Sequence, residues 1–234
     1  MAEYELTLFV DTSTAVSGGK WPKLYGFKAA GDNHPQSKPL VWFGTDEYAT
    51  KTSIKWDTRC WVYVANPRRD KEPLTSYSPR ELRCGQQFLV DSVKGTGEEL
   101  KYEDPTHMAV INKSGKGLRT GLAGEVSVAG VPAETSPYCE NPLVKGAMTT
   151  FKPVEKVILF IAQSSGEEAE IKKGIVVENA LSSGVVIDAA AAVRDEEDMK
   201  VHFNEKKGIW RWPEGAAWAR SIGQGDDLTN FIHS

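Results

Sequence analysis

Hydrophobic and polar residues alternate along much of the chain, and the clearest alternation runs from Ile54 to Val64. Its even positions are mainly apolar, whereas its odd positions begin with charged residues and end with aromatic ones. A period of two over eleven residues is typical of a β-strand with one face in the core. We therefore predict a strand here, with the side chain of Trp56 buried and that of Lys55 exposed.

Short apolar segments of the same kind recur between the 21 glycines and 12 prolines that punctuate the chain. The further candidate strands are 6–10, 25–27, 40–43, 87–93, 108–111, 125–128, 157–162, 174–177, 185–192, 200–203 and 209–212. Many short strands at fairly even spacing, with turn residues between them, are typical of β-sandwiches and barrels. The pattern predicts an all-β fold, an antiparallel β-sandwich or distorted barrel with one or two short helices.

A few segments depart from the strand pattern. Ser78–Leu82 combines a serine suited to a helix N-cap with a proline at the first helical position and a glutamate at the third, which predicts a short helix. Residues 215–223 carry alanines between glycines and predict a short helix or a packed tail. The alanine run 189–192 could also be helical, but we assign it to a strand because an apolar strand segment precedes it directly. The turn-rich stretches 66–78 and 129–142 are expected to be long loops.

The length and composition are those of an ordinary globular protein. The chain has 234 residues, of which 40% are hydrophobic and 26% are charged. We predict a single β-rich domain over residues 1–234, with two packed sheets or sub-domains that meet near 95–105 as the alternative. The formal net charge is -4, so the chain lacks the basic field that gathers phosphates, and we expect no nucleic-acid partner.

Three features bear on the compartment in which the protein works. The first residues contain no basic region followed by a long apolar one, so we predict no signal peptide. The longest apolar run near the middle, 157–162, is far too short for a transmembrane segment. The three cysteines (Cys60, Cys84 and Cys139) stand at wide spacings and indicate reduced thiols rather than a disulfide scaffold. Together these features predict a cytoplasmic protein.

Several short segments follow one another in a definite order, namely 6–11, 25–27, 41–42 and 55–56, and later Phe151–Phe160. In the N-terminal part, the Val-Trp strand at 41–42 is followed by the Trp-containing strand at 55–56. In Phe151–Phe160, a Pro-Val-x-Lys-Val segment leads into a hydrophobic strand. This order resembles that of a group of uncharacterised microbial β-sandwich proteins. The resemblance covers most of the chain and implies a β-sandwich, but it implies no activity because none is agreed for the group.

The sequence contains none of the common catalytic or cofactor-binding motifs. A Walker-type phosphate loop, G-x-G-x-x-G after a strand, G-x-S-x-G and a Cys-x-x-Cys pair are all absent from the sequence. The four histidines are scattered singly, and neither of the acidic clusters, 195–198 and 226–227, has the spacing of a calcium loop. We therefore expect no metal and no cofactor.

Tryptophan is the unusual feature of the composition, with seven residues. Some of the rings must fill the core, but aromatic surfaces beside polar side chains also bind sugar rings and flat hydrophobic ligands. The predicted ligand-binding residues are Trp210, Trp212, Trp218, Trp61, Tyr63 and Tyr138. The alternative is that these large rings fill the ends of a wide sandwich.

The most specific expectation concerns Trp210 and Trp212. Because they stand two positions apart on a predicted strand, their rings should project from the same face, with Arg211 on the other face. Asp188 and His202, on neighbouring predicted strands, are the titratable residues expected beside these rings, where an apolar wall would shift their pKa values. If the protein is an enzyme, Asp188 and His202 are the candidate catalytic acid or base.

Three classes of function fit these observations. The first is an intracellular, lectin-like protein that binds a carbohydrate or another small molecule on tryptophan and tyrosine surfaces. The second is a cofactor-free enzyme of specialised metabolism, such as a cyclase, an isomerase or a hydrolase, with an aromatic-lined pocket. The third is a self-assembling or membrane-active defence protein, which would form oligomers.

Overall fold

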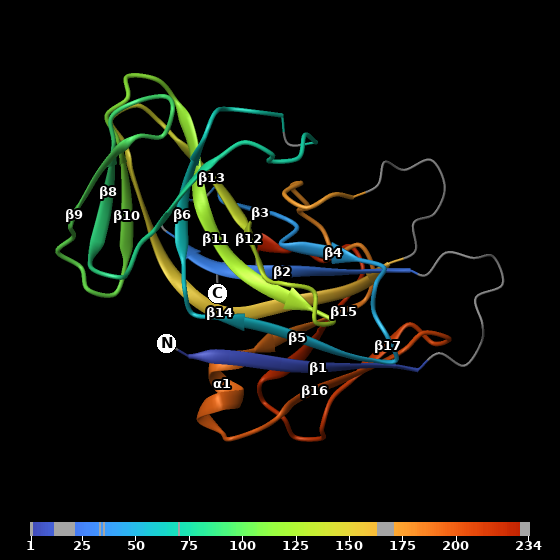
Figure 1. Ribbon diagram of the computed structural model, residues 1–234. Coiled ribbons are helices and arrows are strands. Elements are labelled where there is room, and N and C mark those ends of the chain that lie inside the picture. Colours follow the sequence, from blue (N-terminus) through green and yellow to red (C-terminus); the bar gives the residue numbers. More distant parts are fainter. Residues whose placement is uncertain are drawn as a thin grey trace.

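The computed structural model describes residues 2–11, 22–32, 34, 36–69, 71–162 and 171–229. In these residues the chain forms two curled sheets and one short helix, α1 (Ala189–Arg194) (Figure 1). The protein is therefore nearly all-β, as the sequence predicts.

The strands of the first sheet are β1 (Glu3–Asp11), β3 (Lys38–Pro39), β5 (Lys51–Asp57), β6 (Trp61–Ala65), β7 (Ser78–Glu81), β11 (Leu118–Val128), β12 (Glu134–Pro137), β13 (Cys139–Leu143), β16 (Met199–Asn204) and β17 (Ile209–Arg211). They follow the order β17-β16-β1-β5-β11-β13-β3, with β12 and β6 also paired to β11, and β7 paired to β6.

The strands of the second sheet are β2 (Lys23–Asp32), β4 (Phe43–Thr45), β8 (Gln86–Val90), β9 (Gly97–Lys101), β10 (Met108–Asn112), β14 (Met148–Ala162), β15 (Gly184–Asp188) and β18 (Ala219–Ile222). Their order is β18-β15-β14-β10-β8-β9, with β2 paired to β14, and β4 paired to β2.

Two strand pairs are parallel, so both sheets are mixed rather than purely antiparallel. β1 pairs with β16 from Leu6 opposite Met199 to Asp11 opposite Asn204, and β8 pairs with β10. The first pairing joins segments that are 193 positions apart, since 199 − 6 = 193. It therefore places side chains together that are remote in the sequence.

Most apolar side chains lie between the two sheets, where Trp42 and Phe151 are fully buried. Val177 and Leu228 belong to segments that cover the outer face of the second sheet, and Leu74 belongs to the loop that covers the outer face at β6. Along β1 and β16, in contrast, buried residues alternate with exposed or half-buried ones. The outer face of β1, β5 and β16 is therefore open to water in the part of the chain that the structure describes.

A charged pair lies within the core between the sheets. Lys28 on β2 is only 2% exposed, and its ammonium lies 3.2 Å from the carboxylate of Glu155 on β14. The same ammonium lies 5.6 Å from the ring centre of Trp42 and 5.7 Å from that of Tyr138. The indole N–H of Trp56 donates a hydrogen bond to the Glu155 carboxylate at 3.2 Å. The buried cation is therefore neutralised by one carboxylate and faced by two aromatic rings.

Glu155 reaches this pair because β14 is irregular at that point. The register of β14 against β2 shifts between Pro153 and Val157. Pro153 and Val157 are four positions apart, whereas their partners Ala30 and Lys28 are two apart, so β14 carries two extra residues here, and such a bulge re-aims the side chains within it. The irregularity thus accounts for a carboxylate that points toward Lys28 from within a sheet strand.

The strand predicted over 54–64 is present, although residues 58–60 interrupt it between β5 and β6, which both pair with β11. The predicted register is confirmed, because the Trp56 side chain is buried and Lys55 is exposed. Tyr63 lies on the opposite register and is nevertheless fully buried, because the loop after β6 covers that face.

Several local predictions are wrong. The stretch 129–142, expected to be a loop, contains β12 and β13, and the strand expected at 174–177 is reduced to a single bridge between Val176 and Leu40. Ser78–Glu81 forms β7 on the edge of β6 rather than a helix, and Ala219–Ile222 forms β18 on the edge of β15. In both segments pairing with a sheet edge outweighs weak local helix signals. Ala189–Arg194 is helical rather than extended, because alanine has the highest helix propensity and Asp188 caps the helix by accepting a hydrogen bond from the Ala191 N–H at 2.9 Å.

Candidate ligand-binding site

Two of the predicted site residues, His202 and Trp212, line one hollow on the outer face of the first sheet. This hollow, which we call the Trp212 hollow, has a volume of about 540 Å³. Its lining residues are Asp11, Lys200, His202, Phe203, Asn204, Arg211, Trp212 and Pro213.

The strands explain how these side chains come together. On β16 the alternating burial turns Lys200, His202 and Asn204 toward the outer face, while Val201 is buried in the core. Asp11 is the last residue of β1, where the parallel pairing places it directly opposite Asn204. The hollow is thus assembled at the end of a strand pair, beside the edge strand β17.

Aromatic rings provide the apolar part of the Trp212 hollow. The imidazole of His202 stacks on the ring of Phe9, with ring centroids 4.7 Å apart and planes inclined by 11°. Phe9 and His202 are opposite each other in the β1–β16 pairing. Trp212 is half-buried and follows β17 directly. A flat ring or the apolar face of a sugar can pack on such surfaces.

The polar groups of the hollow differ in whether they already have partners. The side-chain amide of Asn204 donates a hydrogen bond to the Asp11 carboxylate at 2.9 Å, and the Lys200 ammonium pairs with Asp198 at 2.7 Å, which lowers the pKa of that carboxyl. In the described part of the chain, the guanidinium of Arg211 makes no hydrogen bond or ion pair. The hollow therefore offers a fixed Asp–Asn pair and one guanidinium that is available to an anion.

Of the two tryptophans expected to wall one pocket, only Trp212 lines the Trp212 hollow, and Trp212 also packs in part against the core cluster that contains Trp210. Trp210 is 6% exposed, packs on Phe203 with ring centroids 4.9 Å apart, and donates its indole N–H to the Ser183 carbonyl at 3.0 Å. β17 ends at Arg211, so the strand alternation does not extend to Trp212. Arg211 and Trp212 both line the hollow, while Trp210 lies in the core.

The other predicted aromatic residues lie elsewhere. Tyr63, Tyr138 and Trp218 are almost fully buried, and burial raises the pKa of both tyrosines well above the usual value. Trp61 is half-buried and lies under the guanidinium of Arg59, 5.6 Å from the ring centre. None of these four rings lines the Trp212 hollow.

The structure also separates the two predicted catalytic residues. Asp188 ends β15 in the second sheet and caps α1, whereas His202 is on β16 in the first sheet. Asp188 therefore has a structural partner, and only His202 lines the hollow.

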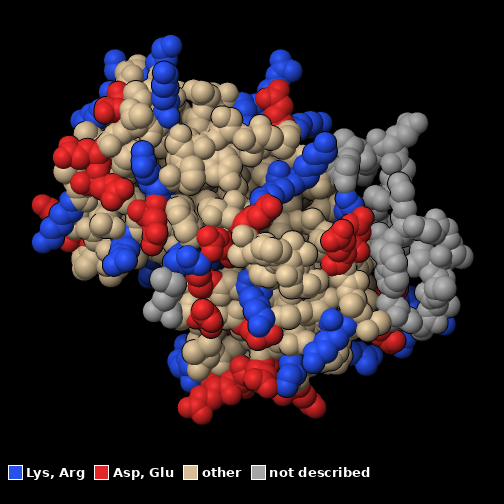
Figure 2. All heavy atoms as spheres, in the orientation of Figure 1, with Lys and Arg blue, Asp and Glu red and all other residues tan. Residues whose placement is uncertain are grey.

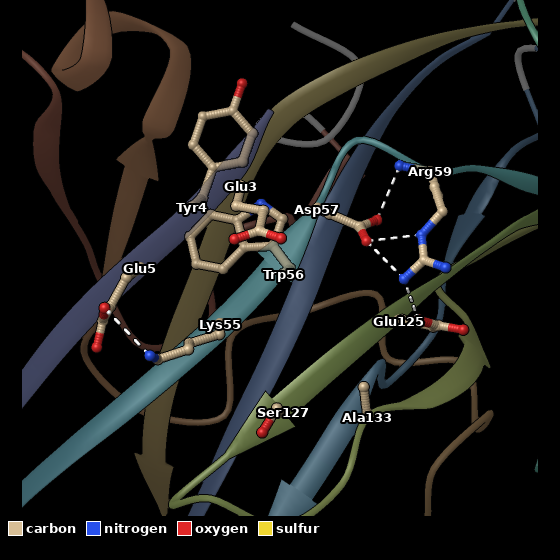
Figure 3. A pocket seen from close by; sticks show the side chains of 10 residues that line it. All are labelled: Glu3, Tyr4, Glu5, Lys55, Trp56, Asp57, Arg59, Glu125, Ser127 and Ala133. Atoms are coloured by element: carbon tan, nitrogen blue, oxygen red, sulfur yellow. Dashed lines mark hydrogen bonds and ion pairs between the residues drawn. The ribbon is translucent and has the colours of Figure 1, made fainter. Parts of the chain in front are cut away.

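A second hollow lies on the same outer face, toward the other end of β1 (Figure 3). It has a volume of about 390 Å³ and is lined by Glu3, Tyr4, Glu5, Lys55, Trp56, Asp57, Arg59, Glu125, Ser127 and Ala133. We call it the Glu5 hollow. Most of its side chains come from β1, β5 and β11, the neighbouring strands at the middle of the sheet, and Arg59 and Ala133 come from the segments that precede β6 and β12.

The charged groups of the Glu5 hollow are largely paired. Glu5 accepts a hydrogen bond from the Ser53 hydroxyl at 2.7 Å and pairs with Lys55 at 3.3 Å, and these contacts lower the pKa of Glu5. The Arg59 guanidinium contacts Asp57 at 2.7 Å and Glu125 at 2.6 Å. The hollow contains four acidic and two basic residues, so its net charge is negative.

Sequence reasoning missed Phe9, Asp11, Asn204 and Arg211. Phe9 and Asn204 stand on the outward register of their strands, which the alternation of β1 and β16 could have indicated. Nothing in the sequence pairs β1 with β16, however, because parallel partners this remote leave no local signal. Arg211 lies on the face opposite Trp210, as predicted, but the hollow opens on that face, so Arg211 contributes a charge to it.

Other kinds of site find no support in the residues that the structure describes. No group of three or more histidine, cysteine, aspartate or glutamate side chains is placed to hold a metal ion there. All three cysteines are free, as predicted. Within the same residues no helix has the length and apolar character needed to cross a membrane.

No protein-family model, no curated protein and no solved structure matches the chain. The resemblance to uncharacterised microbial β-sandwich proteins therefore stays a prediction. The function has to be argued from the geometry of the two hollows.

Proposed function

We propose that this protein binds a small ligand that combines a sugar or another flat ring with an acidic group, and that the Trp212 hollow is its binding site. The observation that carries the proposal is the guanidinium of Arg211, which lines the same hollow as the half-buried Trp212 and has no protein partner among the described residues. A guanidinium binds a carboxylate or sulfate through two parallel hydrogen bonds.

The remaining groups fit the ring of such a ligand. Trp212 and the stacked Phe9–His202 pair offer apolar surfaces for the ring. The Asp11 carboxylate can accept a hydrogen bond from a ligand hydroxyl, because an ionised carboxylate has several acceptor sites and Asn204 occupies one of them. Asn204 also holds Asp11 in place, which reduces the entropy that binding must overcome.

An enzymatic role is less well supported. In the described residues no hydrogen bond joins His202 to a carboxylate that would orient it for proton transfer. Asp188 accepts the capping hydrogen bond of α1 instead. A binding protein therefore fits the hollow better than a hydrolase or an isomerase does.

The test compares acidic sugars with neutral ones of the same ring. Glucuronic acid and N-acetylneuraminic acid, with glucose and N-acetylglucosamine as neutral counterparts, would be titrated into the protein by calorimetry and by NMR. We expect the acids to bind at least about tenfold more tightly than the neutral sugars, because a charge-assisted hydrogen bond contributes about 1.5–3 kcal/mol.

Three variants locate the binding. Arg211→Ala should remove the preference for acids, and Trp212→Ala should weaken the binding of every ring. Lys206→Ala, which removes an exposed cation from the turn between β16 and β17, is the matched control and should change neither. The proposal fails if no sugar binds, or if Arg211→Ala binds acids as the unchanged protein does.

A further inference from the structure

The two hollows lie on one continuous surface. The face between them is formed by the outward side chains of β16, β1 and β5, among them Thr7, Phe9 and Lys200. These side chains are exposed or half-buried. The outer face of the second sheet at β2, β14 and β15, and that of the first sheet at β6, instead carry apolar clusters that pack under covering segments. A ligand that enters the Trp212 hollow therefore meets no covering segment of the described chain on its way to the Glu5 hollow.

The length of this surface exceeds that of a single ring. The Trp212 hollow includes Asp11 and the Glu5 hollow includes Glu3, at the two ends of β1. These residues are eight positions apart, since 11 − 3 = 8, which corresponds to about 26 Å at about 3.3 Å per residue. A ligand that contacts both hollows must be a chain.

The two ends of the surface carry opposite charge. The Trp212 hollow contains the two basic residues Lys200 and Arg211 and the single acidic residue Asp11, whereas the Glu5 hollow contains four acidic and two basic residues. A uniformly acidic polymer would be attracted at one end and repelled at the other. A chain with one acidic end unit, followed by neutral or amino sugars whose hydroxyl and amino groups donate to carboxylates, matches both ends.

The pairing of the strands disfavours a peptide on this surface. Extended peptides are usually bound by adding a strand to a free sheet edge, through main-chain hydrogen bonds. Over Leu6–Phe9 the main chain of β1 is already paired on both sides, with β16 and with β5, so the middle of the surface offers no free sheet edge. Only side chains are available on the face, and side-chain carboxylates and amides suit sugar hydroxyls.

We infer that the ligand is an oligosaccharide with an acidic end unit in the Trp212 hollow and a neutral or amino-sugar chain that extends across β1 to the Glu5 hollow. This inference rests on the proposed function and adds to it a second subsite and the class of ligand. Glu3 and Glu5 are the subsite residues, because they belong to β1 and their carboxylates face the same hollow.

The experiment measures affinity as a function of chain length. The probes are sugars of one, three and five units that share an acidic end unit, in one series ending in N-acetylneuraminic acid and in another ending in glucuronic acid. We expect the affinity to rise at least about tenfold from one to five units in the series that binds, because further hydrogen bonds to carboxylates form in the second hollow.

Variants in the Glu5 hollow separate this inference from the proposed function. Glu3→Gln/Glu5→Gln should weaken binding of the five-unit probe about five- to tenfold and leave the one-unit probe within about twofold. Glu98→Gln, on the exposed strand β9, is the matched control and should alter neither.

If affinity does not rise with length, or if the double variant weakens short and long probes alike, the second subsite is refuted and the single-ring site stands. If no acidic unit binds at all, the proposed function fails and this inference fails with it.

Discussion

Removal of the Glu155 carboxylate would leave the Lys28 ammonium buried without its counter-ion. Lys28 is 2% exposed, and its side chain reaches the core between the sheets from β2, so the ammonium cannot move into water without a local opening of the strand. The rings of Trp42 and Tyr138 remain beside it, but cation–π contacts contribute only about 0.5–2 kcal/mol. Glu155→Ala also leaves the indole N–H of Trp56 without its acceptor.

The magnitudes for the two single variants differ. Breaking a buried ion pair from one side costs about 3–5 kcal/mol, so we expect that loss of unfolding free energy for Glu155→Ala. Lys28→Met should cost less, about 1–3 kcal/mol, because the Glu155 side chain is 11% exposed and keeps the hydrogen bond from Trp56. The double variant Lys28→Met/Glu155→Leu replaces both charges by apolar groups and should lie within about 2 kcal/mol of the unchanged protein.

Urea unfolding, followed by tryptophan fluorescence and by circular dichroism, measures these differences in unfolding free energy. Thermal unfolding measures the accompanying change in melting temperature. Glu155→Ala should lower the melting temperature by about 6–20 °C, at about 2–4 °C per kcal/mol for a chain of this size. The double variant should be more stable than Glu155→Ala alone, which is the signature of coupling between the two residues. The reasoning is refuted if Glu155→Ala loses less than about 1 kcal/mol, or if the double variant is no more stable than Glu155→Ala.

Three further predictions test the fold and the separation of its sites. Trp56→Ala should lose about 3–5 kcal/mol of unfolding free energy, as large core truncations do, while Lys55→Ala on the opposite register should be near neutral; equal losses in urea unfolding would contradict the register. A thiol reagent should modify Cys84, which is exposed, in the folded protein, and should reach the two buried cysteines only on unfolding, because burial raises the pKa of Cys60 to about 11; three equivalents of rapid reaction in the native protein would show otherwise. Asp188→Ala should cost about 0.5–2 kcal/mol through loss of the α1 cap and leave sugar affinity unchanged, and an effect on binding alone would return Asp188 to the site.

Strand alternation was informative where one face of a strand meets the core and the other meets water. The register of Trp56 and Lys55 could be predicted for this reason. It failed for Tyr63, because the loop after β6 covers the face that the pattern assigned to solvent. It also gave no warning that Trp210 would be buried in the core rather than line a pocket, because the rings that cover it, such as Phe203, belong to a neighbouring strand. In both cases the missing information was the position of a neighbouring segment, which a local period does not contain.

The candidate site was predictable only in part for a related reason. Residues such as His202 and Trp212 could be selected by residue type and by position near a strand end. Their partners Phe9 and Asp11 are supplied by a strand almost 200 positions away, through the parallel pairing of β1 with β16. Asp188 was misassigned because the alanine run after it was interpreted as a strand. An aspartate before such a run can be either a helix cap or a titratable group at a strand end, and here it is the cap of α1.

The pairing of β1 with β16 also determines when the binding surface can exist during biosynthesis. β1 is synthesised long before β16, and until β16 emerges from the ribosome one edge of β1 has no partner in this sheet. Contacts between such distant segments raise the contact order and slow folding, since the loop must close before they stabilise anything. A nascent chain that has formed β5 and β11 can already hold the Glu5 hollow, whereas the Trp212 hollow forms only after β16 and β17 have joined the sheet. The half of the surface proposed to select the acidic unit is therefore the last to be completed.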